Sequence, residues 1–222
     1  MKKLYVWMMT AALALGLHTS AMAADLWQAE VKITSLHKMM RIMESGYTFR
    51  SSDASVASVT PDGIIRFHKE GTAVISMTQG DITVHQPYRV VIESRDTAGF
   101  AAEVVRLVNI ERAKYGIAPV AEDVRWQVCA DIRAEELTRY FSHTRPDGRD
   151  CASVLDDYGV RYRHMGENAA MGHDTPADVV AGWMDSDGHR ANLLDSRYSP
   201  LAVGCRQGAD GELYWIQLFT TR

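Results

Sequence analysis

Cysteine is scarce in this 222-residue chain, and the three cysteines present cannot all pair with one another. Cys129, Cys151 and Cys205 all lie in the C-terminal half, and none stands in a C-x-x-C or other metal-ligand spacing. An odd number leaves at least one thiol free or bonded to another molecule. The spacing excludes a cysteine-based metal motif, and it leaves open which pair, if any, forms a disulfide.

The chain also lacks a run of basic residues. It has 24 Lys and Arg against 28 Asp and Glu, a formal net charge of −4. Proteins that bind nucleic acid usually carry a basic patch or stripe, and anionic lipid attracts the same feature. We therefore expect neither nucleic acid nor an anionic lipid surface to be the main partner.

Long apolar runs are absent except at the N-terminus. There, Lys2 and Lys3 precede an apolar stretch from Leu4 to about Leu17, and Ala21-Met22-Ala23 follows. This order is typical of a secretory signal peptide spanning residues 1–23, and the stretch is short for a membrane span. An uncleaved anchor is the alternative. No cysteine follows the small residues, which argues against a lipid anchor. Cleavage would leave 22 basic residues against 28 acidic ones, a charge of −6.

Residues 24–95 have the residue pattern of short strands. β-branched and aromatic residues alternate with polar ones, and turn signals such as Pro61-Asp62-Gly63 interrupt them. Strands at this spacing predict a small β-sandwich. Its expected core consists of Val56, Val59, Ile64, Ile65, Val74, Ile75, Val90, Val91 and Ile92. Once the signal peptide is cleaved, no stable membrane insertion is expected.

The stretch "SSDASVASVTPDGIIRFHKEGTAVISM" is similar to bacterial immunoglobulin-like domains of group 2, which share its V-A-x-V and G-T-A-x-I strands around an Asp-Gly turn. The resemblance implies a spacer or adhesive module. His68 and His85 are expected to be solvated strand residues rather than metal ligands.

The residue pattern changes at "SRDTAGF", and residues 96–222 are expected to alternate helices with strands. One helix should run from Phe100 to just before Gly116, and a second should open at Pro119 with an apolar stripe. That stripe comprises Val124, Val128, Ile132, Leu137 and Phe141. A short helix around 151–158, a strand near 165–171 and a helix capped by Thr175 follow. The chain should close with a buried hairpin around a Gly-Ala-Asp-Gly turn.

Three ionisable residues stand at element ends or beside glycines. They are His143 in "SHTRPDG", Glu167 in "MGENAAMG" and His189 in "SDGHRANLL". Imidazole and carboxylate groups titrate or coordinate near neutral pH, but three such residues 24 and 22 positions apart are a weak signal alone.

Five ordered segments strengthen the interpretation. They are "LVNIERAKYGIAPV", "IRAEELTRYFSHTRPDG", "YGVRYRHMGENAAMG", "VVAGWMDSDGHRANLLD" and "AVGC…YWIQLF", and together they run from about 100 to 219. They resemble the CAP superfamily (cysteine-rich secretory protein, antigen 5 and pathogenesis-related 1) in its bacterial form. The resemblance implies an α/β fold, a CAP-type α-β-α sandwich, following the small all-β immunoglobulin-like sandwich.

The resemblance also implies a cleft that carries two histidines and two glutamates. By motif these include His143, Glu167 and His189, whereas Ser186, beside Asp185, stands where the second glutamate would be. Two imidazoles and one carboxylate suffice for Zn²⁺ or another divalent metal with an open fourth position. The alternative is a hydrogen-bonded network that ties helices to the sheet.

Other candidates fare worse. His164 is an odd number of residues from Glu167 on an expected strand, so the two should face opposite ways. Ser142 and Ser186 lack a G-x-S-x-G elbow. Cys151 is expected to be a buried thiol or disulfide rather than a nucleophile paired with His143.

Three functions follow as hypotheses. The leading one is a secreted or periplasmic protein that binds an unidentified cell-envelope or host ligand in the His143, Glu167 and His189 cleft. The second is a hydrolase or protease with Glu167 as base on a metal-bound or His-oriented water. The third is an adhesive protein acting through residues 24–95, with the CAP domain as scaffold.

Overall fold

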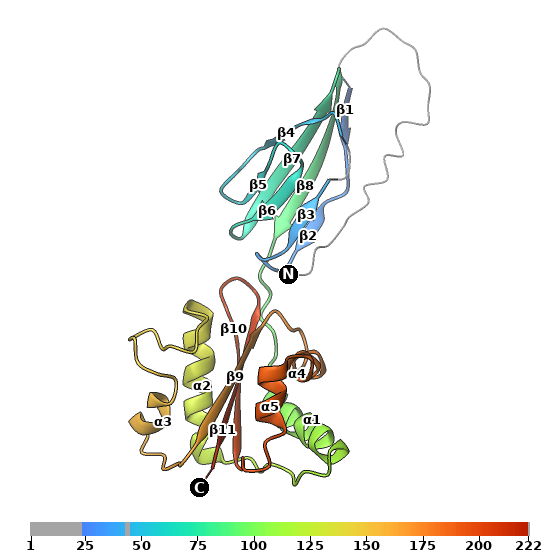
Figure 1. The fold of residues 1–222 in the computed structure, drawn as a ribbon. Coiled ribbons are helices and arrows are strands. Elements are labelled where there is room, and N and C mark those ends of the chain that lie inside the picture. Colours follow the sequence, from blue (N-terminus) through green and yellow to red (C-terminus); the bar gives the residue numbers. More distant parts are fainter. Residues whose placement is uncertain (1–23, 43–44, 222) are drawn as a thin grey trace. The chain divides into compact units, whose positions relative to one another are not determined.

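The computed structural model describes residues 24–42 and 45–221, and the chain divides into two compact units between Glu93 and Ser94 (Figure 1). The predicted signal peptide lies outside the described residues. Among the helices of the described part, none combines the length and the apolar character needed to cross a membrane.

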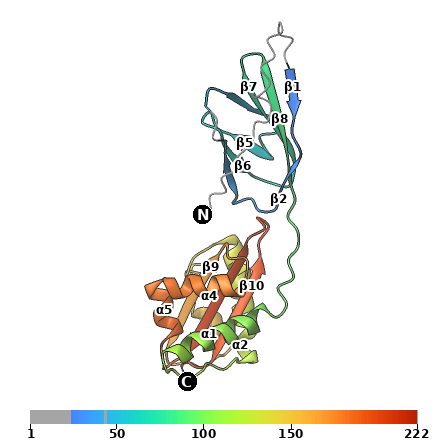
Figure 2. The ribbon, with the colours of Figure 1, turned by 90° about the vertical axis from the view of Figure 1, so that its right-hand side faces the viewer.

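The first unit is built from strands in two sheets (Figure 2). The strands are β1 (Ala24–Trp27), β2 (Val31–Ile33), β3 (Met39–Arg41), β4 (Thr48–Ser51), β5 (Ala57–Val59), β6 (Ile64–Phe67), β7 (Gly71–Gln79) and β8 (Ile82–Val90). One sheet has the order β1-β8-β7-β4 with β2 also on β8, and the other has the order β3-β6-β5. Alternate residues of β7 and β8 are buried, as expected for strands with one face in a core.

The core of this unit was predicted in part. Val56, Ile65, Ile75 and Val90 are buried, as expected. The remaining five expected core residues are only half-buried, namely Val59, Ile64, Val74, Val91 and Ile92. Ile64 and Val74 are chain neighbours of buried residues, and successive side chains of a strand point to opposite faces.

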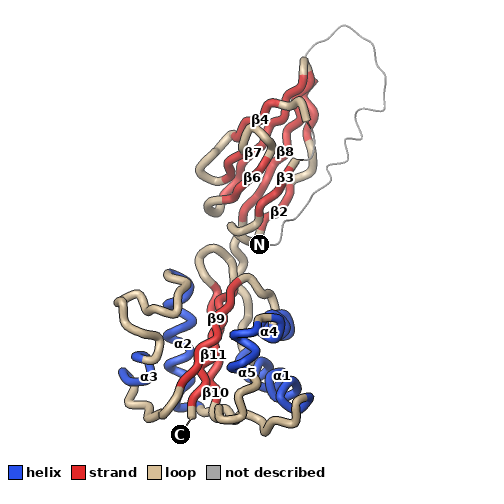
Figure 3. Tube along the Cα trace, in the orientation of Figure 1, coloured by secondary structure: helices blue, strands red, loops and turns tan. Residues whose placement is uncertain are grey.

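The second unit is a three-stranded sheet between two layers of helices (Figure 3). Its elements are α1 (Phe100–Lys114), α2 (Val124–Arg139), α3 (Ser153–Asp157), β9 (Met165–Met171), α4 (Pro176–Asp185), α5 (Asp187–Leu193), β10 (Leu201–Gln207) and β11 (Leu213–Thr220). The sheet order β10-β11-β9 puts the hairpin strand β11 in the centre and β9 at an edge. Every residue of β11 is buried, which confirms the expected hairpin.

Side-chain alternation along β11 separates two cores. Leu213, Trp215 and Phe219 pack with α1, α4 and α5 on one face. Tyr214, Ile216 and Leu218 pack with α2 and α3 on the other. The expected α-β-α arrangement is therefore present, and the same alternation along β9 decides which helix layer each of its side chains meets.

The start of α2 corrects the prediction. The helix begins at Val124, not near Pro119, because the Asp123 side chain caps it by accepting from the Arg125 amide. The expected stripe is also partly wrong, since Val128 and Phe141 are exposed. The face that packs carries Trp126, Cys129, Ala130, Ala134 and Leu137. Small residues on that face let the helix approach the sheet closely.

Candidate functional site

The three predicted site residues lie on the edge strand β9 and on two segments beside it. His143 lies in the loop after α2, Glu167 in the middle of β9 and His189 in α5. The Gly-Glu-Asn stretch alternates across the sheet: Glu167 faces α2, and Asn168 faces α5. One edge strand therefore supports both histidines.

His143 and Glu167 are in direct contact. His143 Nδ1 lies 2.7 Å from Glu167 Oε1. The carboxylate side chain is 2% exposed, whereas the imidazole is 62% exposed. The buried carboxylate thus orients a histidine that faces solvent.

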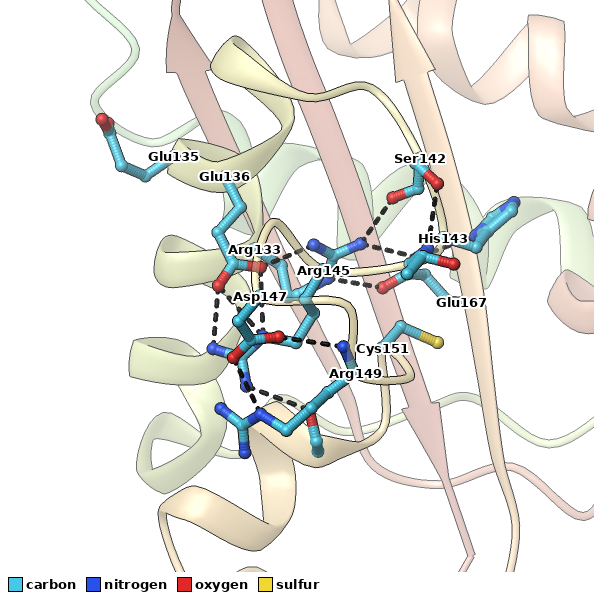
Figure 4. A network of polar contacts seen from close by, with 12 residues as sticks. Arg133, Glu135, Glu136, Ser142, His143, Arg145, Asp147, Arg149, Cys151 and Glu167 are labelled. Carbon is cyan, nitrogen blue, oxygen red and sulfur yellow. Dashed lines mark hydrogen bonds and ion pairs between the residues drawn. The ribbon is translucent and has the colours of Figure 1, made fainter.

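Glu167 is held in turn by an arginine outside the set of predicted site residues. Arg133 of α2 donates through Nε to Oε2 at 2.9 Å and through Nη2 to Oε1 at 3.1 Å (Figure 4). The Arg133 side chain has no exposed surface. Its Nη2 also donates to the Ser142 carbonyl at 2.9 Å, which fixes the backbone just before His143. Arg133 therefore positions both members of the His143–Glu167 pair.

The charged contacts continue away from the sheet. Arg133 Nη1 donates to Glu136 Oε2 at 2.6 Å, and Arg145 Nη2 donates to the other oxygen of Glu136 at 2.8 Å. Arg145 reaches Asp157 of α3 at 2.7 Å. Positive and negative groups alternate along the whole path, which is how buried charges become tolerable.

These contacts shift the pKa of the buried members in opposite directions. Burial alone would raise the pKa of Glu136, but hydrogen bonds from Arg145 and Arg133 outweigh it and lower that pKa. Burial would lower the pKa of Arg133, but its bonds to Glu167 and Glu136 raise it. Both groups therefore stay charged at neutral pH.

The second histidine is positioned from the opposite face of β9. Asn168 Nδ2 donates to the His189 carbonyl at 3.1 Å and to Gln217 Oε1 at 3.0 Å. Asn192 Nδ2 donates to Asn168 Oδ1 at 2.9 Å, so two side chains attach α5 to the strand. A side chain at Gly166 would come within 2.9 Å of Asn192 Oδ1, which explains why this position of the motif is glycine.

His189 belongs to the site through its neighbour rather than through Glu167. Burial lowers the pKa of His189, and the charge of His143 lowers it further. Within the described residues, no hydrogen bond or ion pair joins the His189 side chain to Glu167. The structure therefore brings together a bonded pair, His143 and Glu167, and a half-buried histidine that responds to it electrostatically.

The donor set does not fit the expected metal. Both oxygens of Glu167 already accept hydrogen bonds from Arg133, and Oε1 also contacts His143. Across residues 24–42 and 45–221, no group of three or more His, Cys, Asp or Glu is arranged to hold a metal ion. Ser186, in the place of the expected glutamate, lies between α4 and α5, and Asp185 is exposed.

The remaining candidates are accounted for by local structure. Cys151 is buried and free, and burial, together with the nearby Glu167 charge, raises its pKa to about 12, so it is no nucleophile at neutral pH. Ser142 Oγ accepts from the Thr144 amide. His164 is exposed just before β9.

Two polar side chains beside the site join elements to one another. Asn168 joins β9 to α5 and to β11. Arg190 joins α5 to α4, since its Nη1 donates to the Met184 carbonyl near the end of α4 at 2.7 Å. No local signal marked Arg133, because the stripe that predicted the buried face of α2 followed Val124, Val128 and Ile132 rather than Ala130 and Ala134.

Two solved bacterial proteins, one described as extracellular and one as an outer surface protein, have a similar fold. An extracellular protein containing a SCP domain from Bacillus anthracis str. Ames superposes with a TM-score of 0.53 at 19% identity, covering 83% of this chain and 67% of that one. An outer surface protein from Borrelia burgdorferi gives 0.53 at 20% identity, covering 59% and 98%. At these identities the likeness shows the fold alone.

Two proteins of Bacillus subtilis strain 168 are similar in sequence. The uncharacterized protein YkwD is 32% identical over 124 residues, which are 55% of this chain and 47% of YkwD. The uncharacterized membrane protein YlbC is 34% identical over 105 residues, 46% of this chain and 30% of YlbC. The chain thus spans half or less of the length of these relatives. The model of the CAP, cysteine-rich secretory protein family matches residues 105–219, more than half of the chain. The chain therefore belongs to the CAP family.

Proposed function

We propose that this protein is exported and binds a ligand of the cell envelope or of a host through the surface around His143 and His189. The N-terminal residues have the order of a secretory signal peptide. The similar proteins of Bacillus anthracis and Borrelia burgdorferi are described as extracellular and as an outer surface protein. Both features favour a site of action outside the cytoplasm.

One observation carries the ligand-binding role, namely that a buried ion pair fixes an exposed histidine. Glu167 is held by Arg133 through both oxygens and engages Nδ1 of His143, while the imidazole is 62% exposed. Within residues 24–42 and 45–221 no hydrogen bond to the other ring nitrogen, Nε2, is found, so Nε2 can exchange one with a ligand. Pre-orienting the ring lowers the entropy lost on binding, which favours affinity without requiring chemistry.

The hydrolase hypothesis asks more of the same residues. A general base must be within reach of water, whereas the Glu167 side chain is 2% exposed and both its oxygens accept hydrogen bonds from Arg133. Metal assistance needs a third donor beside the two histidines. We therefore favour binding over catalysis and place the metal-assisted reaction second.

Binding to purified sacculi and to immobilised host-matrix glycans, measured with the mature chain, tests the proposal. His143→Ala and His189→Ala should each weaken binding at least about tenfold, as for the loss of one good polar contact. His164→Ala is the matched control, because this histidine is also exposed but lies outside the site. The proposal is contradicted if His143→Ala and His189→Ala bind as tightly as His164→Ala and the wild-type protein.

A calorimetric titration of Zn²⁺ into metal-stripped protein separates the binding role from the metal-assisted one. We expect no stoichiometric binding, because the carboxylate that would complete the set is engaged. Stoichiometric binding that disappears in a His143→Ala/His189→Ala double variant would restore the metal and make a hydrolase screen worthwhile.

A second candidate role belongs to the first unit, which we propose to be the immunoglobulin-like module that its strand motifs resemble. Trp27 of β1 is 67% exposed and stacks on His85 with ring centroids 4.5 Å apart. An exposed aromatic on a sheet can serve as an adhesive contact. If adhesion acts here, Trp27→Ala in the full chain should abolish binding that His143→Ala leaves intact.

A further inference from the structure

A groove lies on the second unit among residues that the His143 network does not use. This open groove of about 630 Å³ runs between the start of α2 and the segment 158–163 that follows α3. Trp126, which is 5% exposed, contributes to its lining from α2. A volume of this order is within the usual range of small-ligand sites.

The groove concentrates positive charge in an acidic protein. Arg125, Arg161 and Arg163 line it, whereas the whole chain carries a net charge of −4. Arg125 is paired with Asp123. The side chains of Arg161 and Arg163 are exposed, and no hydrogen bond or ion pair to either side chain is found in the part of the chain that the structure describes.

Two such arginines beside a groove point to an oxyanion. A guanidinium presents a planar fork of donors that matches a carboxylate or a phosphate. The Arg163 amide donates to the Thr221 carbonyl, so the backbone that carries these arginines is attached to the end of the β11 strand rather than hanging free. The positive charge is therefore presented from an anchored segment.

Two tyrosines give the groove a preference among anions. Tyr158 is 52% exposed and lies in the lining beside Gly159. Tyr162 is partly buried against the core below and its hydroxyl lies 3.4 Å from Asp156, which holds its ring in place. The negative face of an aromatic ring attracts the polarised C–H groups of a pyranose, and a rigid ring costs little entropy to present.

We propose that this groove binds an anionic sugar, a glycan whose ring stacks on Tyr158 while its carboxylate or phosphate pairs with Arg161 and Arg163. An acidic peptide would use the arginines but has no ring to place on the tyrosine. The site is independent of the His143 and His189 surface, so failure of either proposal leaves the other standing.

The test is isothermal titration of the full mature chain with four defined probes. Tetragalacturonate carries carboxylates, phosphopentamannose carries a phosphate, maltotetraose is neutral, and tetraglutamate is an acidic peptide. At least one anionic sugar should bind, and high salt should weaken it, because the contact is exposed and charged. Which of the two binds identifies the acidic group.

Three variants decide whether the groove is responsible. Arg161→Ser/Arg163→Ser should weaken binding at least about tenfold, and Tyr158→Ala should weaken it with the charge unchanged. The control Arg50→Ser/Arg89→Ser removes the same charge from exposed positions of the first unit and should change affinity less than about twofold. The proposal is overturned if neither anionic sugar binds, if maltotetraose or tetraglutamate binds as tightly, or if the Arg161 and Arg163 variant binds normally.

Discussion

Arg133 and Glu167 form a two-point ion pair inside the second unit, with Nε–Oε2 at 2.9 Å and Nη2–Oε1 at 3.1 Å. The pair connects the centre of α2 to the edge strand β9, where the helix packs on the sheet. Everything that orients His143 passes through it, because Glu167 engages the ring and Arg133 engages the Ser142 carbonyl. A contact between two buried charges therefore shapes the candidate site.

Removing the charge of Glu167 should destabilise the fold. Glu167→Gln keeps the shape but leaves the fully buried Arg133 with only Glu136 as an anionic partner, and breaking a buried pair on one side typically costs about 3–5 kcal/mol. Glu135→Gln is the matched control, since the Glu135 side chain is exposed on α2, the helix of Arg133, and points away from the network (Figure 4). We expect the control to change stability by less than about 0.5 kcal/mol.

Urea unfolding followed by circular dichroism measures both variants. Equal stability of Glu167→Gln and Glu135→Gln would mean that the pair contributes no net stabilisation, and that its role is confined to orienting His143.

The stability of the second unit should also fall as the solution is acidified below neutral pH. The folded state lowers the pKa of His189 below its usual value near 6.5, first through burial and then through the charge of His143. At pH values between the folded and the unfolded pKa of His189, the unfolded chain binds more protons than the folded one. The stability that the fold gains from a neutral His189 is therefore present above the unfolded pKa, and it is lost as the pH falls through the folded pKa.

Proton NMR titration of the His189 ring checks the direction. In His143→Ala the pKa of His189 should rise but stay below 6.5, because burial remains after the neighbouring charge is removed. A pKa at or above 6.5 in the wild-type protein would show that His189 is neither desolvated nor coupled to His143.

Several elements of the second unit were predictable because local signals agreed with tertiary packing. The strand Met165–Met171 and the Thr175 cap of α4, whose Oγ1 accepts from the Asp178 amide, were confirmed to the residue. Gly116 follows α1 with φ +68°, as its position after the helix predicted. These signals depend on a few neighbouring residues, so the sequence alone carries them.

The site was predictable only through a family resemblance, and its support was not predictable at all. His143 and Glu167 are 24 residues apart, and nothing local indicates that they touch. Arg133 and Glu136 look like the polar face of a helix, because a charge on a helix is usually solvated. They are buried because they pair with Glu167 on β9 and with Arg145 in a loop. A short stretch of sequence does not indicate such long-range pairs.

The three cysteines should be unreactive in the native protein. All are free and buried, and burial raises the pKa of Cys151 and of Cys205 to about 12 each, so neither forms thiolate at neutral pH. Ellman's reagent at about pH 8, near the ordinary thiol pKa, should therefore detect almost no thiol before denaturation and three after it. Fewer than three after denaturation would reveal a disulfide, and rapid native reaction would reveal local opening.

Close packing of α2 on β10 predicts a sharp contrast between two glycines. A Cβ at Gly204 of β10 would lie 2.3 Å from the Ala130 carbonyl oxygen and 2.7 Å from its carbon, both backbone atoms of α2. Backbone cannot move aside as a flexible side chain can, so Gly204→Ala must push α2 off the sheet. Overpacking of this kind costs about 1–3 kcal/mol, and more where the obstacle is main chain.

Gly188 of α5 is the natural comparison, because a Cβ there meets nothing within 4 Å. Alanine is favoured over glycine within a helix by up to about 1 kcal/mol, so Gly188→Ala should be neutral or stabilising even though it adjoins His189. Thermal unfolding of both variants separates them: Gly204→Ala should melt well below the wild-type protein, and Gly188→Ala at or above it. Similar melting temperatures for the two variants would show that α2 and β10 are not packed at this distance, and the placement of Arg133 against Glu167 would have to be revised with them.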